Sequence, residues 1–202
     1  MQLLGDSSED DMIAAFLHAE LSSERFGPHL HALLRQDHVD QRVISSPDLT
    51  SAPENAYRRA LLGRFRGYGR DHDLFAGFPS VLTWRRVALA PADVLTIRYI
   101  NYVYWVALSG GTRLPSDAAR SIQEGRGVCD VPLDGFFRIV AALRQGARCP
   151  ELICVRRDAS APLVVLEGHL RLTAYALAPE TIPSPTAIIL GTAAEIVRWG
   201  CY

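Results

Sequence analysis

Lysine is absent from this 202-residue chain, and all 21 of its basic residues are arginine. This absence excludes a P-loop lysine, a lysine Schiff base and a lysine general base. The formal net charge is −1, so the chain as a whole is not built to coat nucleic acid or an anionic membrane. Purely apolar runs, such as residues 187–190, are far too short to span a bilayer.

Cysteine is scarce as well, and none of the 4 cysteines belongs to a C-x-x-C pair. The histidines do not have zinc-site spacing either, so we predict no bound metal from these residues. The acidic start MQLLGDSSEDD lacks the basic and apolar stretches of a secretory signal. We therefore expect a cytoplasmic protein with reduced thiols, among them a buried Cys154, because disulfides rarely persist in that compartment.

The hydrophobic pattern divides the chain into two parts. Residues 1–80 read as a helical extension, whose short helices have too few apolar positions to fold without a partner. One of these helices is expected to begin at Ser51 and to end at Gly63. Residues 81–202 read as an α+β core, on which the extension packs.

Within the core, strands and helices alternate. A strand at 163–166, LVVL, is apolar on both faces and is predicted to lie in the centre of the sheet. One continuous helix is expected over 91–108, and a closing helix over 192–199 with Thr192 as its N-cap. The other predicted core elements are strands at 81–89, 152–155 and 186–190, and helices at 115–124, 133–145 and 169–178.

The most informative segment is the end of the 163–166 strand, which continues as Glu167-Gly168-His169-Leu170-Arg171. Gly168 permits a sharp turn and close approach of a ligand to the backbone. A helix opening after it offers free N–H groups and a positive dipole end, which suit a phosphate. His169 and Arg171 add donors, while Glu167 could hold a metal ion, orient a hydroxyl or act as a base.

The run from Gly168 to Ala174 resembles the Gly-x-x-Arg turn and helix of the ParB/sulfiredoxin superfamily. The form E-G-H-x-R is most similar to the D-G-H-x-R of its ADP-dependent free-serine-kinase branch. The resemblance covers roughly residues 82–190 and implies a small mixed sheet flanked by helices. It also implies ATP or ADP with Mg²⁺, with Gly168, His169 and Arg171 on the phosphates. Thr173 and Arg113 are added as further phosphate contacts.

Two departures from the family limit what the resemblance implies. Sulfiredoxin has its catalytic cysteine in this turn, where the present chain has His169, so sulfinic acid reductase activity is not expected. ParB carries a helix-turn-helix domain after the core, whereas few residues follow the last predicted strand here. DNA binding through such a domain is therefore not expected.

Two other clusters leave alternatives open. Arginines between residues 58 and 70 alternate with glycines, so Arg66, Tyr68, Arg70 and His72 could form a loop that closes over an anionic substrate. The same residues could instead be a solvated helix face. The aromatic run at 98–105 is either core or a pocket wall that stacks a base while Arg113 reaches a phosphate.

These observations predict a nucleotide-binding enzyme, a kinase-like transferase that moves phosphate to a small hydroxylated metabolite, with Glu167 and His169 as catalytic residues. One alternative is a ParB-like nuclease or nucleic-acid-associated protein, which the arginine cluster favours and the net charge opposes. Another is a non-catalytic regulatory module. A small-molecule partner is expected, without nucleic acid or membrane, and the sequence leaves the oligomeric state open. Arg171→Ala is expected to weaken nucleotide binding and to leave the stability of the ligand-free chain nearly unchanged or slightly raised. If Arg171 is instead a structural residue that pairs with Glu167, the substitution is expected to lower that stability, and affinity falls only in step with folding.

Overall fold

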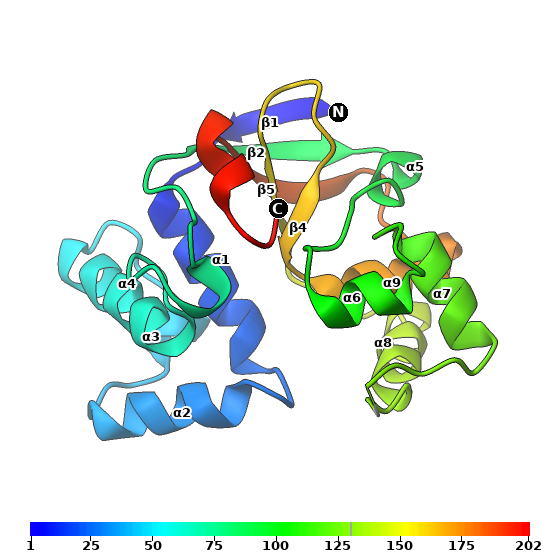
Figure 1. Cartoon of the computed structure of the whole chain (residues 1–202). Coiled ribbons are helices and arrows are strands. Elements are labelled where there is room, and N and C mark those ends of the chain that lie inside the picture. Colours follow the sequence, from blue (N-terminus) through cyan, green and yellow to red (C-terminus); the bar gives the residue numbers. More distant parts are fainter. Residues whose placement is uncertain (130) are drawn as a thin grey trace.

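The computed structural model of the chain describes residues 1–129 and 131–202. Its centre is a five-stranded mixed sheet in the order β1-β2-β5-β3-β4 (Figure 1). Neighbouring strands are antiparallel except for β3 and β5, which run parallel. This arrangement confirms the α+β class and the mixed sheet. The strands are β1 (Gln2–Asp6), β2 (Thr83–Leu89), β3 (Leu152–Arg156), β4 (Val164–Glu167) and β5 (Thr186–Thr192).

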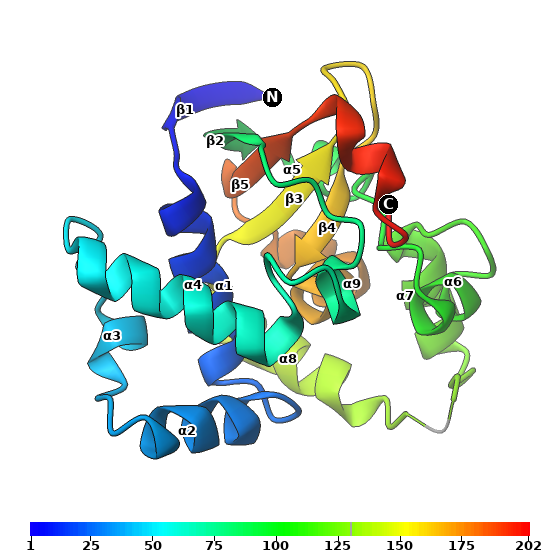
Figure 2. The same cartoon turned by 60° about the vertical axis from the view of Figure 1, so that its left-hand side comes forward.

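Helices pack on both sides of this sheet (Figures 1 and 2). The first group consists of α1 (Glu9–Leu21), α2 (Gly27–Gln36), α3 (Arg42–Ser45) and α4 (Ala52–Arg66). The second consists of α5 (Pro91–Val94), α6 (Val103–Leu108), α7 (Pro115–Gln123), α8 (Asp134–Arg144) and α9 (His169–Leu177). Short 3₁₀ helices are η1 (Asp73–Phe75), η2 (Pro179–Thr181) and η3 (Ala194–Arg198). No helix of the described residues has the length and apolar composition needed to cross a membrane.

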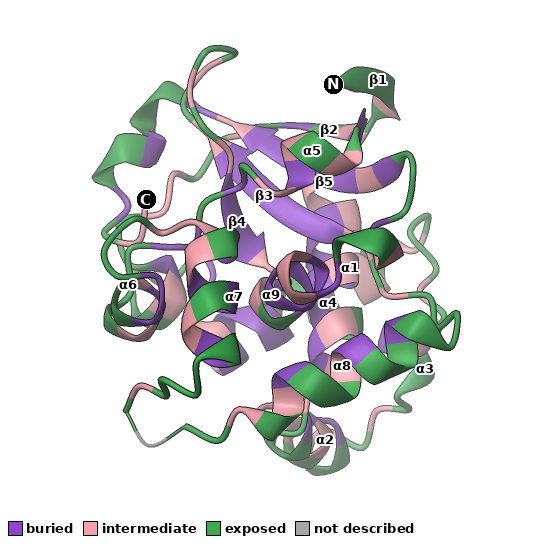
Figure 3. Cartoon of the chain, turned by 90° about the vertical axis from the view of Figure 1, so that its right-hand side faces the viewer, coloured by how far each residue is buried: buried purple, intermediate pink, exposed green. Residues whose placement is uncertain are grey.

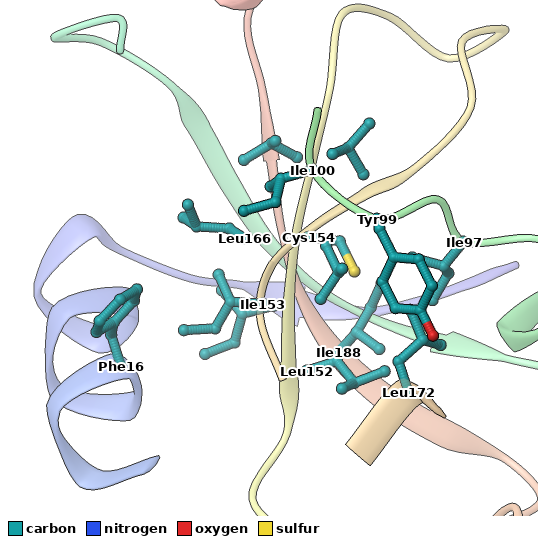
Figure 4. Close-up of a cluster of buried hydrophobic side chains, with 14 of the residues drawn as sticks. Phe16, Ile97, Tyr99, Ile100, Leu152, Ile153, Cys154, Leu166, Leu172 and Ile188 are labelled. Carbon is teal, nitrogen blue, oxygen red and sulfur yellow. The ribbon is translucent and has the colours of Figure 1, made fainter. Parts of the chain in front are cut away.

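The core lies on both faces of β3. Phe16 of α1 packs on the side of Ile153, while Tyr99 and Leu172 pack on the side of Cys154 (Figure 4). The inner strands β3 and β5 are therefore buried, whereas β2 keeps exposed residues in its first half. Exposed residues gather on the outer faces of the helices (Figure 3). Cys154 is fully buried, as the sequence predicts.

Local sequence signals set several helix boundaries. Ser8 and Asp11 form a reciprocal capping box at the start of α1. Ser51 caps α4 by accepting a hydrogen bond from the Glu54 N–H, which confirms the predicted start of this helix. The predicted end at Gly63 is wrong, because α4 continues to a left-handed Gly67. Gly63 is buried inside the helix, where a Cβ would lie 3.0 Å from the Tyr68 carbonyl oxygen, so close packing explains this glycine.

Two predicted helices are shorter or interrupted in the structure. The expected helix over 91–108 is broken into α5 and α6, because the chain between them runs beside β4. There the Arg98 N–H donates to the Leu163 carbonyl, and the Val165 N–H donates to the Arg98 carbonyl, each at 2.8 Å. At the end of the chain, Thr192 belongs to β5 and caps nothing, and the closing helix is the short η3.

Strand placement differs from the sequence expectation at both edges of the sheet. The β4 strand lies at an edge and not in the centre. It is nevertheless buried, because the Arg98 segment bridges its outer side and side chains cover both faces. At the other edge, β1 forms within the part of the chain that reads as helical, and it pairs antiparallel with β2. The sheet thus includes the first residues of the chain.

Candidate functional site

The junction between β4 and α9 adopts the predicted strand, glycine and helix arrangement. Gly168 is the N-cap of α9 with φ +108°, a left-handed conformation that favours glycine. A Cβ at this position would clash with Leu152 Cδ2 and would lie 3.1 Å from Arg171 Nη2. No side chain of residues 1–129 or 131–202 caps this helix, which leaves the N–H groups of its first turn available to an anion.

Arg171 folds back over the same turn and is 8% exposed. Its Nη2 donates to Glu167 Oε1 at 2.9 Å, and its Nη1 donates to the Pro150 carbonyl oxygen at 2.8 Å. This is the ion pair of the structural alternative, so Arg171→Ala is now expected to lower stability, because it would leave the Glu167 carboxylate without its partner. A guanidinium has five N–H donors, so Arg171 keeps donors for a ligand.

His169 lies against an aromatic wall. Its imidazole stacks on Trp105, with ring centroids 5.1 Å apart, and lies nearly parallel to the ring of Tyr99. Its Nε2 is buried and has no hydrogen-bond partner within the described residues. Burial, reinforced by the charges of Arg66 and Arg171, lowers the pKa of His169 to about 3, so the ring is neutral at pH 7.

Thr173 links Tyr99 of this wall to the backbone at the start of α9. Its hydroxyl donates to the His169 carbonyl oxygen at 2.8 Å and lies 2.6 Å from the Tyr99 hydroxyl. The Thr173 side chain is fully buried. Its observed contacts therefore fix the first turn of α9 and the orientation of the aromatic ring.

Glu20 of α1 joins this site, and the sequence prediction did not include it. The side chain is 4% exposed and accepts a hydrogen bond from Arg66 Nη1 at 2.7 Å. Burial and then the charge of Glu167 raise the pKa of Glu20 to about 7, although Arg66 lowers it. The sequence holds one sign of this burial, because Glu20 lies at helical spacing from Ile13, Phe16 and Leu17 and so shares their apolar face.

We call Glu20, Arg66, Glu167, His169 and Arg171 the turn cluster. Ion pairs join Glu20 to Arg66 and Glu167 to Arg171. The charges of the second pair also act on the pKa of Glu20, and those of both arginines on the pKa of His169, although α1, α4 and α9 are far apart in sequence. The Arg66 guanidinium also lies 4.3 Å from the ring centroid of Phe26, which holds its position. Of the residues proposed for the arginine-rich loop, Arg66 is the one that reaches Glu20.

The other residues of that loop make contacts elsewhere. The Tyr68 hydroxyl donates to Glu9, and His72 Nδ1 lies 2.7 Å from Asp73 Oδ2. Arg70 is exposed, and its side chain lies next to the backbone of Gly63. The contacts of these residues therefore position the end of α4 and the segment that follows it.

The other arginines between residues 58 and 70 form hydrogen bonds and ion pairs within the chain. Arg58 is 1% exposed and donates to the Val43 and Asp48 carbonyl oxygens, both at 2.9 Å. Arg59 pairs with Glu9 and Asp10, and Arg64 pairs with Asp37. Their positive charge is therefore spread over several helices and balanced by internal acceptors.

Arg113 also binds the backbone. Its Nε donates to the Tyr99 carbonyl at 2.8 Å, and its Nη1 donates to the Tyr202 carbonyl at 3.0 Å. Burial and the charge of Arg98 lower its pKa. Nη2 of Arg113 is buried without a partner among the described residues, so one donor of this guanidinium is unused.

No family model, no curated protein and no solved structure matches this chain. The likeness to the ParB/sulfiredoxin superfamily therefore rests on the residues from Gly168 to Ala174 and on the strand that precedes them. The chemistry of the turn cluster is the basis for the function proposed below.

Proposed function

We propose that this chain is a ParB/sulfiredoxin-like, nucleotide-binding phosphotransferase that acts in the cytoplasm on a small hydroxylated metabolite. The observation that carries the proposal is the Gly168 turn, where an uncapped helix N-terminus and the Arg171 guanidinium converge. Backbone N–H groups, a helix dipole and an arginine fork are the groups that bind phosphate in proteins. We assign the phosphates of ATP or ADP to this turn.

The charge of the turn cluster supports an anionic ligand. Arg66 and Arg171 bring two positive charges. Their carboxyl partners are Glu20 and Glu167, and Glu20 is partly protonated at pH 7, so the negative charge does not fully balance the positive. The neutral His169 adds a buried Nε2 that lacks a partner within the described residues. A phosphate oxygen or hydroxyl at this point would satisfy that nitrogen, whose burial is otherwise costly.

Phosphate transfer to a hydroxyl also requires a group that takes the hydroxyl proton. A carboxyl with a pKa near 7 is better matched to this task than an imidazole with a pKa near 3. We therefore assign the proton to Glu20 and the orientation of the hydroxyl to Glu167. His169 is then a hydrogen-bonding residue of the site and not its base.

The turn cluster also has a carboxylate that could hold Mg²⁺, the ion that the family resemblance implies. Magnesium in nucleotide sites is held by one or two carboxylates together with phosphate oxygens, and Glu167 is the residue that could supply one. When bound, the ion would neutralise phosphate charge. The described residues contain no group of three or more metal-ligating side chains, so no ion is expected to bind there without the nucleotide.

The nucleic-acid alternative has weaker support. It relied on the arginines between residues 58 and 70, and four of these have acceptors or carboxylates of the same chain as partners. A surface that binds nucleic acid needs several unpaired positive charges in one stripe. No specific observation favours the regulatory alternative over the enzyme.

Calorimetric titration with ADP and ATP, with and without Mg²⁺, tests the proposal. The paired variant Glu167→Gln/Arg171→Gln removes both charges of the buried ion pair and keeps hydrogen-bonding groups, so the fold should survive. We expect it to weaken Mg²⁺-free ADP binding by roughly one to two orders of magnitude, the value of a charged fork to phosphate. Arg64→Gln, which alters an ion pair on α4, is the matched control and should bind ADP normally.

Two results would contradict this proposal. One is the absence of ADP and ATP binding at about 1 mM nucleotide, the weakest affinity of interest here. The other is equal ADP affinity in the wild type and the Glu167→Gln/Arg171→Gln variant, with both melting at similar temperatures. The second result would make the ion pair a purely structural feature.

A further inference from the structure

A concave site lies on the sheet, away from the turn cluster. It is a groove of about 430 Å³. Three register pairs of the strands line it, namely Leu3 with Val87, Thr83 with Thr192, and Arg85 with Leu190, and Met1, Arg156 and Ala159 complete the lining. Residues paired across adjacent strands share one face of a sheet, so these side chains project from the same face. In Figures 1 and 2 this end of the sheet, with β1 and β2, lies far from α9.

The groove has positive charge without an internal partner. Neither Arg85 nor Arg156 forms an ion pair with any carboxylate of the described residues. Arg156 makes only long hydrogen bonds, to the Thr192 hydroxyl at 3.4 Å and the Ala159 carbonyl at 3.5 Å. The carboxylate nearest in the strand register is Asp6, which is exposed opposite Arg85 at the end of β1.

The neighbouring arginine on β2 shows the contrast. Arg86 points to the other face of the sheet and donates to Glu151 at 3.0 Å, so its charge is balanced. Two adjacent arginines of one strand thus have different environments. The residue that faces the groove is the one without a partner among the described residues.

The floor of the groove is apolar. Val87 and Leu190 are buried beneath it, whereas Leu3 and Met1 at its rim are 54% and 59% exposed. The lining contains no aromatic side chain on which a base could stack, which argues against a nucleotide in this groove. Its volume falls within the range of about 300–1,000 Å³ that is usual for small-molecule sites.

We propose that this groove binds an aliphatic organic anion, with a carboxylate or phosphate head group between Arg85 and Arg156 and an apolar chain along Leu3, Val87 and Leu190. The Thr83 and Thr192 hydroxyls supply hydrogen bonds beside the head group. Charge complementarity selects the head group, and burial of Leu3 and Met1 selects the apolar chain. This site is independent of the nucleotide proposal, since it shares no residue with the turn cluster.

Three probes of the same chain length separate these contributions, namely decanoate, decyl phosphate and decanol. Calorimetric titration is expected to show binding of at least one anion, and binding of decanol that is weaker by roughly tenfold or more. Leu3 and Met1 resonances should shift in the NMR spectrum when the anion is added, and those near Gly168 should not. If decanoate and decyl phosphate both fail to bind at about 1 mM, the proposal is wrong.

Charge variants locate the head group. Arg85→Gln and Arg156→Gln should each weaken binding of the anion by roughly tenfold, whereas Asp6→Asn should strengthen it. Arg86→Gln, on the opposite face of β2, is the matched control and should leave affinity unchanged. Equal losses in Arg86→Gln and Arg85→Gln, or equal affinity for decanol and decanoate, would overturn the assignment. Melting temperatures of all variants show whether each one remains folded.

Discussion

The buried carboxyl of Glu20 gives the sharpest physical prediction. The Glu20→Gln substitution keeps the size of the side chain and its hydrogen bond from Arg66, but it removes the titration. In the folded chain the pKa of Glu20 rises from 4.5 to about 7, chiefly through burial and then through the charge of Glu167. The folded state therefore binds a proton that the unfolded chain releases at lower pH.

The direction of the pH dependence follows from this difference. Because the folded pKa lies above the unfolded one, the stabilising contribution of Glu20 is fully present below pH 4.5 and is lost as the pH rises through 7. Each pKa unit corresponds to about 1.4 kcal/mol, so the contribution changes by about 3 kcal/mol over this interval. Relative to the wild type, Glu20→Gln should gain about this much stability between pH 4.5 and 8.

Urea unfolding at several pH values measures the effect. The useful quantity is the difference in unfolding free energy between the wild type and Glu20→Gln, because the other titrating groups cancel. Glu24→Gln alters an exposed carboxylate just after the same helix and is the control. A wild-type-minus-variant difference that stays constant with pH, or that rises, would refute the reasoning.

Two further substitutions test the structural argument. Gly168→Ala should cost about 2–4 kcal/mol of unfolding free energy, since it adds left-handed strain and a clash with Leu152. Gly146→Ala, at φ +85° with open space around it, should cost only the strain, and equal losses at the two glycines would rule out the clash. Arg58→Ala should destabilise the chain by about 3–5 kcal/mol, because it empties the space of a buried side chain and removes its hydrogen bonds to two backbone carbonyls. The half-exposed Arg59 should cost under about 1 kcal/mol when changed to alanine, and a similarly small loss for Arg58→Ala in urea unfolding would contradict its structural role.

The sequence determined the features that depend on neighbouring residues. The change from strand to helix around Gly168 could be predicted, because an apolar β-rich run, a glycine and a helical stripe follow one another directly. The start of α4 at Ser51 could be predicted for the same reason, since a cap acts within one turn. The mixed α+β class followed from the sum of such local patterns.

Only the tertiary structure decided which distant residues meet. The exposed residues of β1 have no apolar alternation, so pairing with β2 alone makes them a strand. The 91–108 segment gives up its helix because backbone bonds along β4 satisfy an edge that would otherwise be open. Glu20 and Arg66 reach the Gly168 turn only because α1 packs against β3 and α4 packs on α1. Burial, which no local pattern specifies, then changes the chemistry of Glu20 and His169.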